Sequence, residues 1–425
     1  MATQIPAGSA LANKVFGAAL FAAQQRKPTL AGNLTGPAPK QPKAEAKLKG
    51  QSSPDMPVVE VTSLEDNAGD LVSVDLFNVV GGKPIMGDNK AEGRGRALST
   101  SSMELKVNQF RLPVSAGGEM TRKRTVHNLR GIAMASVIGY FPRLRDQLML
   151  VHLAGARGSQ EGTDWVVPLS TDADYTTIMV NAVKAPSYNR HYVADSTSIV
   201  QGGAQLASID STDLLKLEHI DALRALLDDL ENPMQPVKIA DDPAGDDEPL
   251  YVMIVSPRAY SSLLTNTSGA VLRTFQQNAV TRASYGSKHP LFRGEVGLWN
   301  GILVKKATRS IRFNASDAVP HITSANEATA TETNVTVNAG LAAGYAIDRC
   351  LLLGAQAAIC AYGKHHNSGF YFNWSEKKLD HDNELEIAAA AMAGFAKTRF
   401  SIPNSSGTAI PTDHGVLVFD VAVKL

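Results

Sequence analysis

Histidine and carboxylate side chains gather in two short segments of the chain, and they form its richest set of potential metal ligands. His365 and His366 are adjacent, and Asp380–Asp382 reads Asp-His-Asp. Adjacent histidines point to different sides of most backbones, so at most one of them would join a shared site. The spacing matches neither HExxH nor a regular zinc pattern, and the acidic run 241–248 lacks the spacing of a calcium-binding EF-hand loop. We therefore expect no metal centre and no cofactor.

Nucleophilic chemistry has equally little support in the sequence. There is no GxSxG motif, and neither Cys350 nor Cys360 has a histidine at a spacing that would suggest a catalytic pair. His127 and His152 lie in a segment with helical periodicity and are typical of packing or surface residues. Two cysteines also cannot build a disulfide framework, which fits a reducing compartment. The chain is predicted not to be an enzyme.

A glycine-rich segment with several cations, residues 81–96, raises the question of phosphate binding. It lacks the GKS or GKT ending of a phosphate-binding loop, and Lys83 lies between its glycine pairs instead of after them. A solvated, charged hairpin tip is the simpler interpretation, although Arg94 and Arg96 could touch a phosphate. A connection of this length usually binds something. We predict that Lys83, Lys90, Arg94 and Arg96 contact a neighbouring subunit.

The charge of the chain balances overall but not locally. It has 41 Lys and Arg against 41 Asp and Glu, yet its first fifty residues are basic. Residues 28–56 are rich in Pro, Ala, Lys and Gly, a composition that cannot bury enough apolar surface to fold alone. We expect this segment to lie on a neighbouring subunit, or to neutralise nucleic-acid phosphates. The residues proposed for these contacts are Lys40, Lys43, Lys47 and Lys49.

The remaining sequence predicts a mixed α+β protein of two or three lobes, since 425 residues exceed one ordinary domain. Alternating strands are expected at Val72–Val80 and Met103–Val114, the second with a one-residue slip of its apolar phase. A long helix is predicted over 121–157, kinked or divided at Pro142, followed by an irregular surface excursion over 158–212. Further elements are predicted as helices at 213–231 and 259–265 and strands at 250–255, 303–305 and 416–423. No apolar run is long enough to cross a bilayer.

Several segments go beyond periodicity and carry a resemblance to a known family. The two longest are His289–Val304 and Arg349–Ala357, and the second is followed by Trp374-Ser-Glu and Asp380-His-Asp-Asn. Shorter matches are Asn232–Val237, Tyr251–Pro257 and Gly394–Lys397. In this order they resemble the major capsid proteins of tailed phages typified by the N-four-like podoviruses. The resemblance runs from about Pro57 to the last residue and leaves out 1–56 and 158–212.

The resemblance implies an HK97-like capsid fold and a division of the chain into five parts. These are an N-terminal arm (1–56), an extended hairpin with peripheral strands (57–118), a peripheral-domain spine helix with a surface excursion (119–212), an axial domain (213–395) and a C-terminal return to the peripheral sheet (396–425).

The same resemblance implies a function in assembly. Subunits would bind one another as hexamers and pentamers and form an icosahedral shell around double-stranded DNA, with portal, scaffolding and decoration proteins as further partners. Some relatives crosslink a hairpin lysine covalently, for which Lys83 or Lys90 would be the candidates. Two alternatives remain open: an encapsulin-like nanocompartment shell protein, and an α+β enzyme with an unrecognised site.

Overall fold

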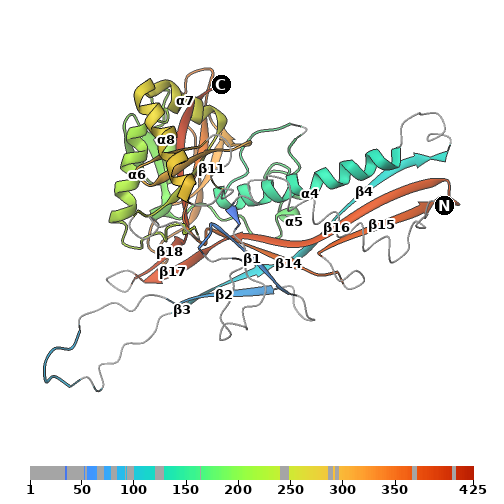
Figure 1. Cartoon of the computed structure of the whole chain (residues 1–425), viewed down its shortest axis with the longest axis horizontal. Helices are drawn as coiled ribbons and strands as arrows, with labels where there is room; N and C mark the ends of the chain where they lie inside the picture. Colours follow the sequence, from blue (N-terminus) through green and yellow to red (C-terminus); the bar gives the residue numbers. More distant parts are fainter. Residues whose placement is uncertain are drawn as a thin grey trace.

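The computed structural model describes residues 34–35, 52, 55–64, 71–77, 84–90, 92, 100–119, 129–162, 164–239, 248–285, 291, 296–365, 371–403 and 408–425. Two lobes are visible in Figure 1, one compact and one elongated, with a thin hairpin below them. The compact lobe contains an eight-stranded sheet, and the elongated lobe contains a five-stranded sheet beside a long helix. This mixture of helices and strands confirms the predicted α+β class.

The eight-stranded sheet has the order β6-β5-β19-β13-β7-β9-β8, with β10 paired to β13. Its two longest strands, β13 (Tyr345–Leu353) and β19 (Val416–Lys424), are antiparallel and buried over almost their whole length. Apolar side chains on both faces join two hydrophobic clusters, which explains why these strands are continuous apolar runs. The other strands are β5 (His191–Asp195), β6 (Ser198–Gln201), β7 (Tyr251–Val255), β8 (Val296–Trp299), β9 (Ile302–Lys306) and β10 (Ile311–Phe313).

Three helices supply apolar side chains to one cluster of the compact lobe: α6 (Leu217–Asp229), α7 (Pro257–Asn266) and α8 (Gly269–Tyr285). Helix α7 begins at Pro257, two residues before the predicted start at 259, because Ser256 accepts a hydrogen bond from the Ala259 amide at 3.0 Å and Pro257 occupies the first turn. Short turns of helix precede them, namely α5 (Tyr175–Met179), η2 (Tyr188–Arg190) and η3 (Gly203–Ala207).

The five-stranded sheet is built around β16 (Glu384–Lys397), which pairs with β4 and β15 along one half and with β14 along the other. Strand β1 continues the sheet through a parallel pairing with β14. Alternate side chains of β4, β15 and β16 form a cluster with the first half of α4, which therefore covers one face of this sheet. The bounds are β1 (Val58–Leu64), β4 (Asn108–Gly118), β14 (Ala358–Gly363) and β15 (Phe372–Leu379).

The long helix α4 spans Leu129–Ala154, inside the predicted 121–157, and residues 121–128 lie outside the described part. It is one helix that contains Pro142, so of the two predicted effects of that residue the division is wrong, and a kink stays a prediction. Pro142 is buried, and the helix passes from the sheet of the elongated lobe into the main core. It ends at Ala154, three residues before the predicted end, and the next residue, Gly155, has a φ of 66° that favours glycine.

The predicted ranges for the axial domain and for the return to the peripheral sheet do not match the sheets in which the later strands lie. Strands β14, β15 and β16 fall in the range assigned to the axial domain, 213–395, yet they form the sheet against α4. Strand β19 falls in the range predicted to return to that sheet, 396–425, yet it lies in the eight-stranded sheet. Strands β14, β16 and β19 are all rich in apolar residues, and their pairing partners are distant in sequence. Composition therefore does not reveal which sheet each of these strands joins.

Residues 158–212 are also more regular than predicted. Strand β5 is a buried member of the eight-stranded sheet and pairs with β19 in parallel, so the interpretation of this whole segment as a surface excursion is wrong. Sequence periodicity missed it because a strand of five residues that is buried on both faces has no alternation.

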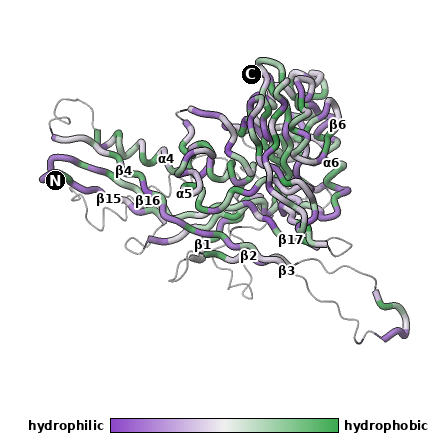
Figure 2. The backbone as a smooth tube through the Cα atoms, turned by 180° about the vertical axis from the view of Figure 1, so that it is seen from behind, coloured by the Kyte–Doolittle hydropathy of each residue, from purple (hydrophilic) through white to green (hydrophobic). Residues whose placement is uncertain are grey.

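A separate antiparallel hairpin consists of β2 (Leu71–Phe77) and β3 (Thr100–Lys106). Figures 1 and 2 show these two strands beside β1, below the two lobes, and the described segment 84–90 apart from both lobes. Val107 separates β3 from β4, so the predicted slip of the apolar phase marks the point where the chain changes from one sheet to the other. Two further strand pairs are β11 (Ala318–Ile322) with β12 (Glu332–Thr336), and β17 (Arg399–Pro403) with β18 (Ala409–Asp413).

Candidate assembly surfaces

Most of the cationic residues selected from the sequence lie outside the described residues. This holds for Lys83, Arg94 and Arg96 of the hairpin and for the four arm lysines, Lys40, Lys43, Lys47 and Lys49. Lys90 is described, and it is exposed near the end of the tip segment 84–90. Their contacts with a neighbour or with DNA therefore stay predictions.

The tip segment presents apolar side chains to solvent. All of residues 84–90 are exposed, and the side chains of Ile85 and Met86 have exposed fractions of 38% and 70%. Gly87 adopts a φ of 58°, and the Asn89 side chain donates to the Met86 carbonyl at 2.7 Å, which closes a local turn. In Figure 2 the described tip carries an apolar stretch next to a hydrophilic one. Adjacent exposed apolar side chains at a projecting tip are typical of an interaction site.

The base of the hairpin is anchored. Met103 and Leu105 of β3 are buried in a small cluster with Phe400 of β17 and with residues of β14 and β16. The Ser101 hydroxyl also donates to the Ser401 carbonyl at 2.6 Å. This cluster is separate from the main core, so the hairpin has its own packed base while its tip projects.

The N-terminal arm contributes two described residues. Leu34 is completely buried in the main cluster, and Thr35 forms an isolated parallel bridge with Val58 of β1. The chain before the hairpin is therefore fixed to the same subunit at this point.

One group of side chains, His191, Arg349 and Asp420, combines residue types found in catalytic sites and is buried between β5, β13 and β19. His191 Nε2 lies 2.7 Å from Asp420, and Arg349 donates to both carboxylate oxygens of Asp420 at 2.8 and 2.9 Å. Burial acts to raise the pKa of Asp420, but the Arg349 charge and the hydrogen bonds from both partners bring it to about 2. All three side chains are inaccessible to solvent or nearly so. They form a closed ion pair that no substrate reaches, and their role is to hold three strands together.

A second buried charge cluster joins β16, β17 and β18. Asp413 accepts from Lys397 at 2.8 Å and from Arg399 at 2.7 Å. Burial acts to raise the pKa of Asp413, and the two cations lower it to about 2. Burial also lowers the pKa of Lys397 to about 8, but its ammonium group is held by Asp413 and by the Lys184 carbonyl at 3.1 Å. This lysine is paired and structural.

The sequence candidates for metal binding and thiol chemistry are not brought together. His365 is buried while His381 is exposed on the turn between β15 and β16, and His366 lies outside the described residues. The described part of the chain contains no group of three or more potential metal ligands. Burial raises the pKa of Cys360 to about 12 and that of Cys350 still further, so both are unreactive thiols.

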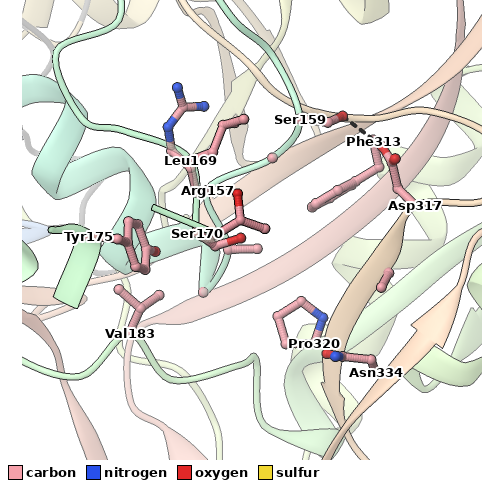
Figure 3. Close-up of a pocket in the computed structure, with 15 residues that line it drawn as sticks. Arg157, Ser159, Leu169, Ser170, Tyr175, Val183, Phe313, Asp317, Pro320 and Asn334 are labelled. Carbon is pink, nitrogen blue, oxygen red and sulfur yellow. Dashed lines mark hydrogen bonds between the residues drawn. The ribbon is translucent and has the colours of Figure 1, made fainter. Parts of the chain in front are cut away.

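A pocket of about 520 Å³ lies where α4 ends beside β10 and β11. Figure 3 shows Tyr175, Val183, Phe313 and Pro320 around it, with Ser159 donating to Asp317 at 2.6 Å. The Asp317 carboxylate of this lining is already bound by the Ser159 hydroxyl and by the Asn314 amide, so both hydrogen bonds join loops of the same subunit. No helix among the described residues is long and apolar enough to span a membrane.

Comparison with known proteins agrees with a shell-forming architecture. The model of a family described as phage capsid protein matches residues 4–425. The major capsid protein of Pseudomonas phage KPP25 is 22% identical over 373 residues, which cover 86% of this chain and 87% of that protein.

Solved structures give the same result. The capsid of Ralstonia phage GP4 has a TM-score of 0.67 and 26% identity, covering 88% of this chain and 89% of that one. The capsid of cyanophage Pam1 has a TM-score of 0.59 and 17% identity, covering 87% and 89%. The predicted HK97-like fold is thus confirmed, and the narrower N-four-like grouping stays a prediction. The two-lobed fold, the projecting hairpin and these matches together show that the chain belongs to the phage capsid protein family, as a major capsid protein of the virion and not an enzyme.

Proposed function

We propose that the chain closes its shell chiefly through the hairpin tip, with Ile85 and Met86 binding an apolar surface of a neighbouring subunit. The observation that carries this proposal is the exposure of both side chains on a segment that is entirely exposed in the single subunit. A packed base with a projecting apolar end favours a contact between subunits over a contact within one subunit. Subunits would join as hexamers and pentamers into an icosahedral shell.

The cationic residues of the tip and the arm have a supporting role in this proposal. Lys83, Lys90, Arg94 and Arg96 would add charge pairs at the rim of the tip contact, where ion pairs contribute little affinity. Lys40, Lys43, Lys47 and Lys49 would face a neighbour or the enclosed double-stranded DNA, which needs no sequence-specific readout. Assembly in the bacterial cytoplasm, with portal, scaffolding and decoration proteins as partners, belongs to the same proposal.

The test replaces Ile85 and Met86 together by serine and measures assembly by sedimentation and negative-stain microscopy. Loss of apolar contact repeated at every subunit should shift the chain from shells to free subunits or capsomers, because many weak contacts add in a closed lattice. Thermal unfolding of the unassembled chain should stay unchanged, since both side chains are exposed there.

Lys90→Ser is the matched control, because Lys90 lies on the same exposed segment and differs in chemistry. It should leave shell yield nearly intact and alter only the salt dependence of assembly. Shells of normal yield from the double serine variant would overturn the proposed apolar contact. A failure of Lys90→Ser alone to assemble would instead favour an ionic one.

A further inference from the structure

The backbone at Val180, just after α5, has an unusual conformation. Its φ is 62° and its ψ is −57°, and the Asn181 amide donates to the Met179 carbonyl at 2.7 Å across it. This is a classic γ-turn, which is rare and strained. A β-branched residue in the positive-φ region adds to the strain, and such conformations persist only where the surrounding structure enforces them.

Helix α4 supplies part of that enforcement. The Met179 side chain is 98% buried, with an exposed fraction of 2%, and its carbonyl also receives the ring Nε2 of His152 at 3.2 Å. One carbonyl thus holds both the γ-turn and the last turn of the long helix. Burial lowers the pKa of His152 to about 4, so the ring is neutral at pH 7 and its Nε2–H can donate. The turn is fixed on its N-terminal side.

The turn directs the Asn181 side chain at the junction between the hairpin and the five-stranded sheet. Its Oδ1 accepts from the Lys106 amide at 2.8 Å, and its Nδ2 donates to the carbonyls of Lys106 and Phe395, each at 3.0 Å. Lys106 is the last residue of β3, and Phe395 lies in β16. Three hydrogen bonds from one side chain therefore tie the end of the hairpin to the sheet.

The backbones at this junction come unusually close together. A Cβ at Gly394, the residue before Phe395, would lie 2.0 Å from the Lys106 carbonyl oxygen, so only glycine fits there. Beyond Lys106 the chain leaves the hairpin pairing with β2 and enters the pairing with β16. The angle between hairpin and sheet is therefore set within one or two residues, at the position that Asn181 holds.

The segment that carries the turn also has space beside it. Tyr175 and Val183, on either side of the turn in sequence, line the pocket of about 520 Å³ shown in Figure 3. Met179 itself is packed in the main core, so relaxation of the γ-turn would involve the residues that follow it. Strain held by a few hydrogen bonds beside free volume is the arrangement expected of an element with two discrete states.

We propose that Asn181 is a latch that holds the β2–β3 hairpin at one angle to the five-stranded sheet, and that the strained γ-turn at Val180 allows it to release. The closed state has the three Asn181 hydrogen bonds together with the strained turn. In the open state the turn relaxes and the hairpin pivots at Val107. A subunit can then present its hairpin at different angles without unfolding its base.

The test measures hydrogen exchange at the Lys106 amide in the full-length, unassembled chain, because that amide donates to Asn181 in the closed state. Asn181→Ala removes all three side-chain bonds and should speed this exchange by roughly tenfold or more. Val180→Gly removes the strain while keeping Asn181, and it should slow the same exchange several-fold. The amides of Met253 and Leu352 in the eight-stranded sheet are the internal reference and should not change.

Opposite signs that are confined to the Lys106 amide distinguish a latch from a merely structural turn. A structural turn would change the exchange of the reference amides together with that of Lys106, or would change neither, and each of these results would overturn the proposal. The measurement uses free subunits, so its outcome does not depend on whether the hairpin tip makes the contact proposed above. Conversely, normal assembly of the Ile85 and Met86 variant would leave the latch standing.

Discussion

At the scale of single residues, Arg349 and Asp420 lie opposite each other across the β13–β19 pairing, and both are buried. Asp420→Asn should lower the free energy of unfolding by about 3–5 kcal/mol, because it leaves the Arg349 guanidinium buried without its counter-charge. Urea denaturation of the unassembled chain measures the change. Asp228→Asn is the control, since Asp228 pairs with Arg224 at 2.6 Å but is 62% exposed, and it should cost no more than about 0.5 kcal/mol. Equal losses of unfolding free energy in both variants would contradict the interpretation of Arg349 and Asp420 as a stabilising buried pair.

The buried histidines predict a pH dependence of subunit stability. Burial lowers the pKa of His152 and of His219 to about 4, against an ordinary value of 6.5. The folded chain therefore binds fewer protons than the unfolded chain between these values. Stability from these groups is full above pH 6.5 and falls as the pH drops toward 4.

Glutamine in place of His152 can still donate to the Met179 carbonyl through its amide, but it does not titrate. This replacement should therefore remove the one proton that His152 takes up when the chain unfolds. The slope of unfolding free energy between pH 6 and pH 4.5 should fall by about 1.4 kcal/mol per pH unit. Urea titrations at several pH values provide the slope. An unchanged slope would show that His152 titrates normally in the folded chain.

At the scale of elements, the packing of α8 on β8 depends on a glycine. A Cβ at Gly297 would lie 1.8 Å from the Phe275 ring, and Phe275 is fully buried. Gly297→Ala should displace that ring and cost about 1–3 kcal/mol of unfolding free energy. Gly139→Ala in α4 is the matched control, because nothing lies within 4 Å of its Cβ position, and helix propensity should make it stabilising by about 0.5–1 kcal/mol. The same sign for both variants in thermal unfolding would refute this packing argument.

Elements with strong local signals could be predicted from the sequence, and those defined by distant partners could not. The strand at Tyr251–Val255 and the long helix α4 follow from the pattern of neighbouring apolar residues. Val180 carries no such signal, because a strained valine is fixed by α4 and not by its own sequence. The tip was predicted as a contact from its glycines and charges, yet the adjacent Ile85 and Met86 already stood in the sequence as an apolar signal that was overlooked.

At the scale of the whole molecule, the main error of the sequence prediction concerns which lobe each of the later strands joins. Strands β13 and β14 follow each other closely in sequence but lie in different sheets. Strands β16 and β19, which β17 and β18 separate in sequence, also lie in different sheets. All four are apolar, so each is compatible with either core. Arg349 and Asp420 offered one clue, since charges within otherwise apolar strands need a partner of opposite sign, although Asp348 beside Arg349 made that partner ambiguous. The family resemblance gave the correct fold without resolving this assignment.

The position of β19 has a consequence for how the subunit is made. In the eight-stranded sheet, β5 and β6 are joined to the other strands only through β19, which pairs with β5 on one side and β13 on the other. A ribosome synthesises β19 after every one of these partners, so the sheet exists as two unconnected parts until translation has passed Lys424. Nascent and prematurely terminated chains lack the strand that completes the compact lobe. Translation through β19 thus acts as a quality check, because a chain that stops before this strand cannot become a building block.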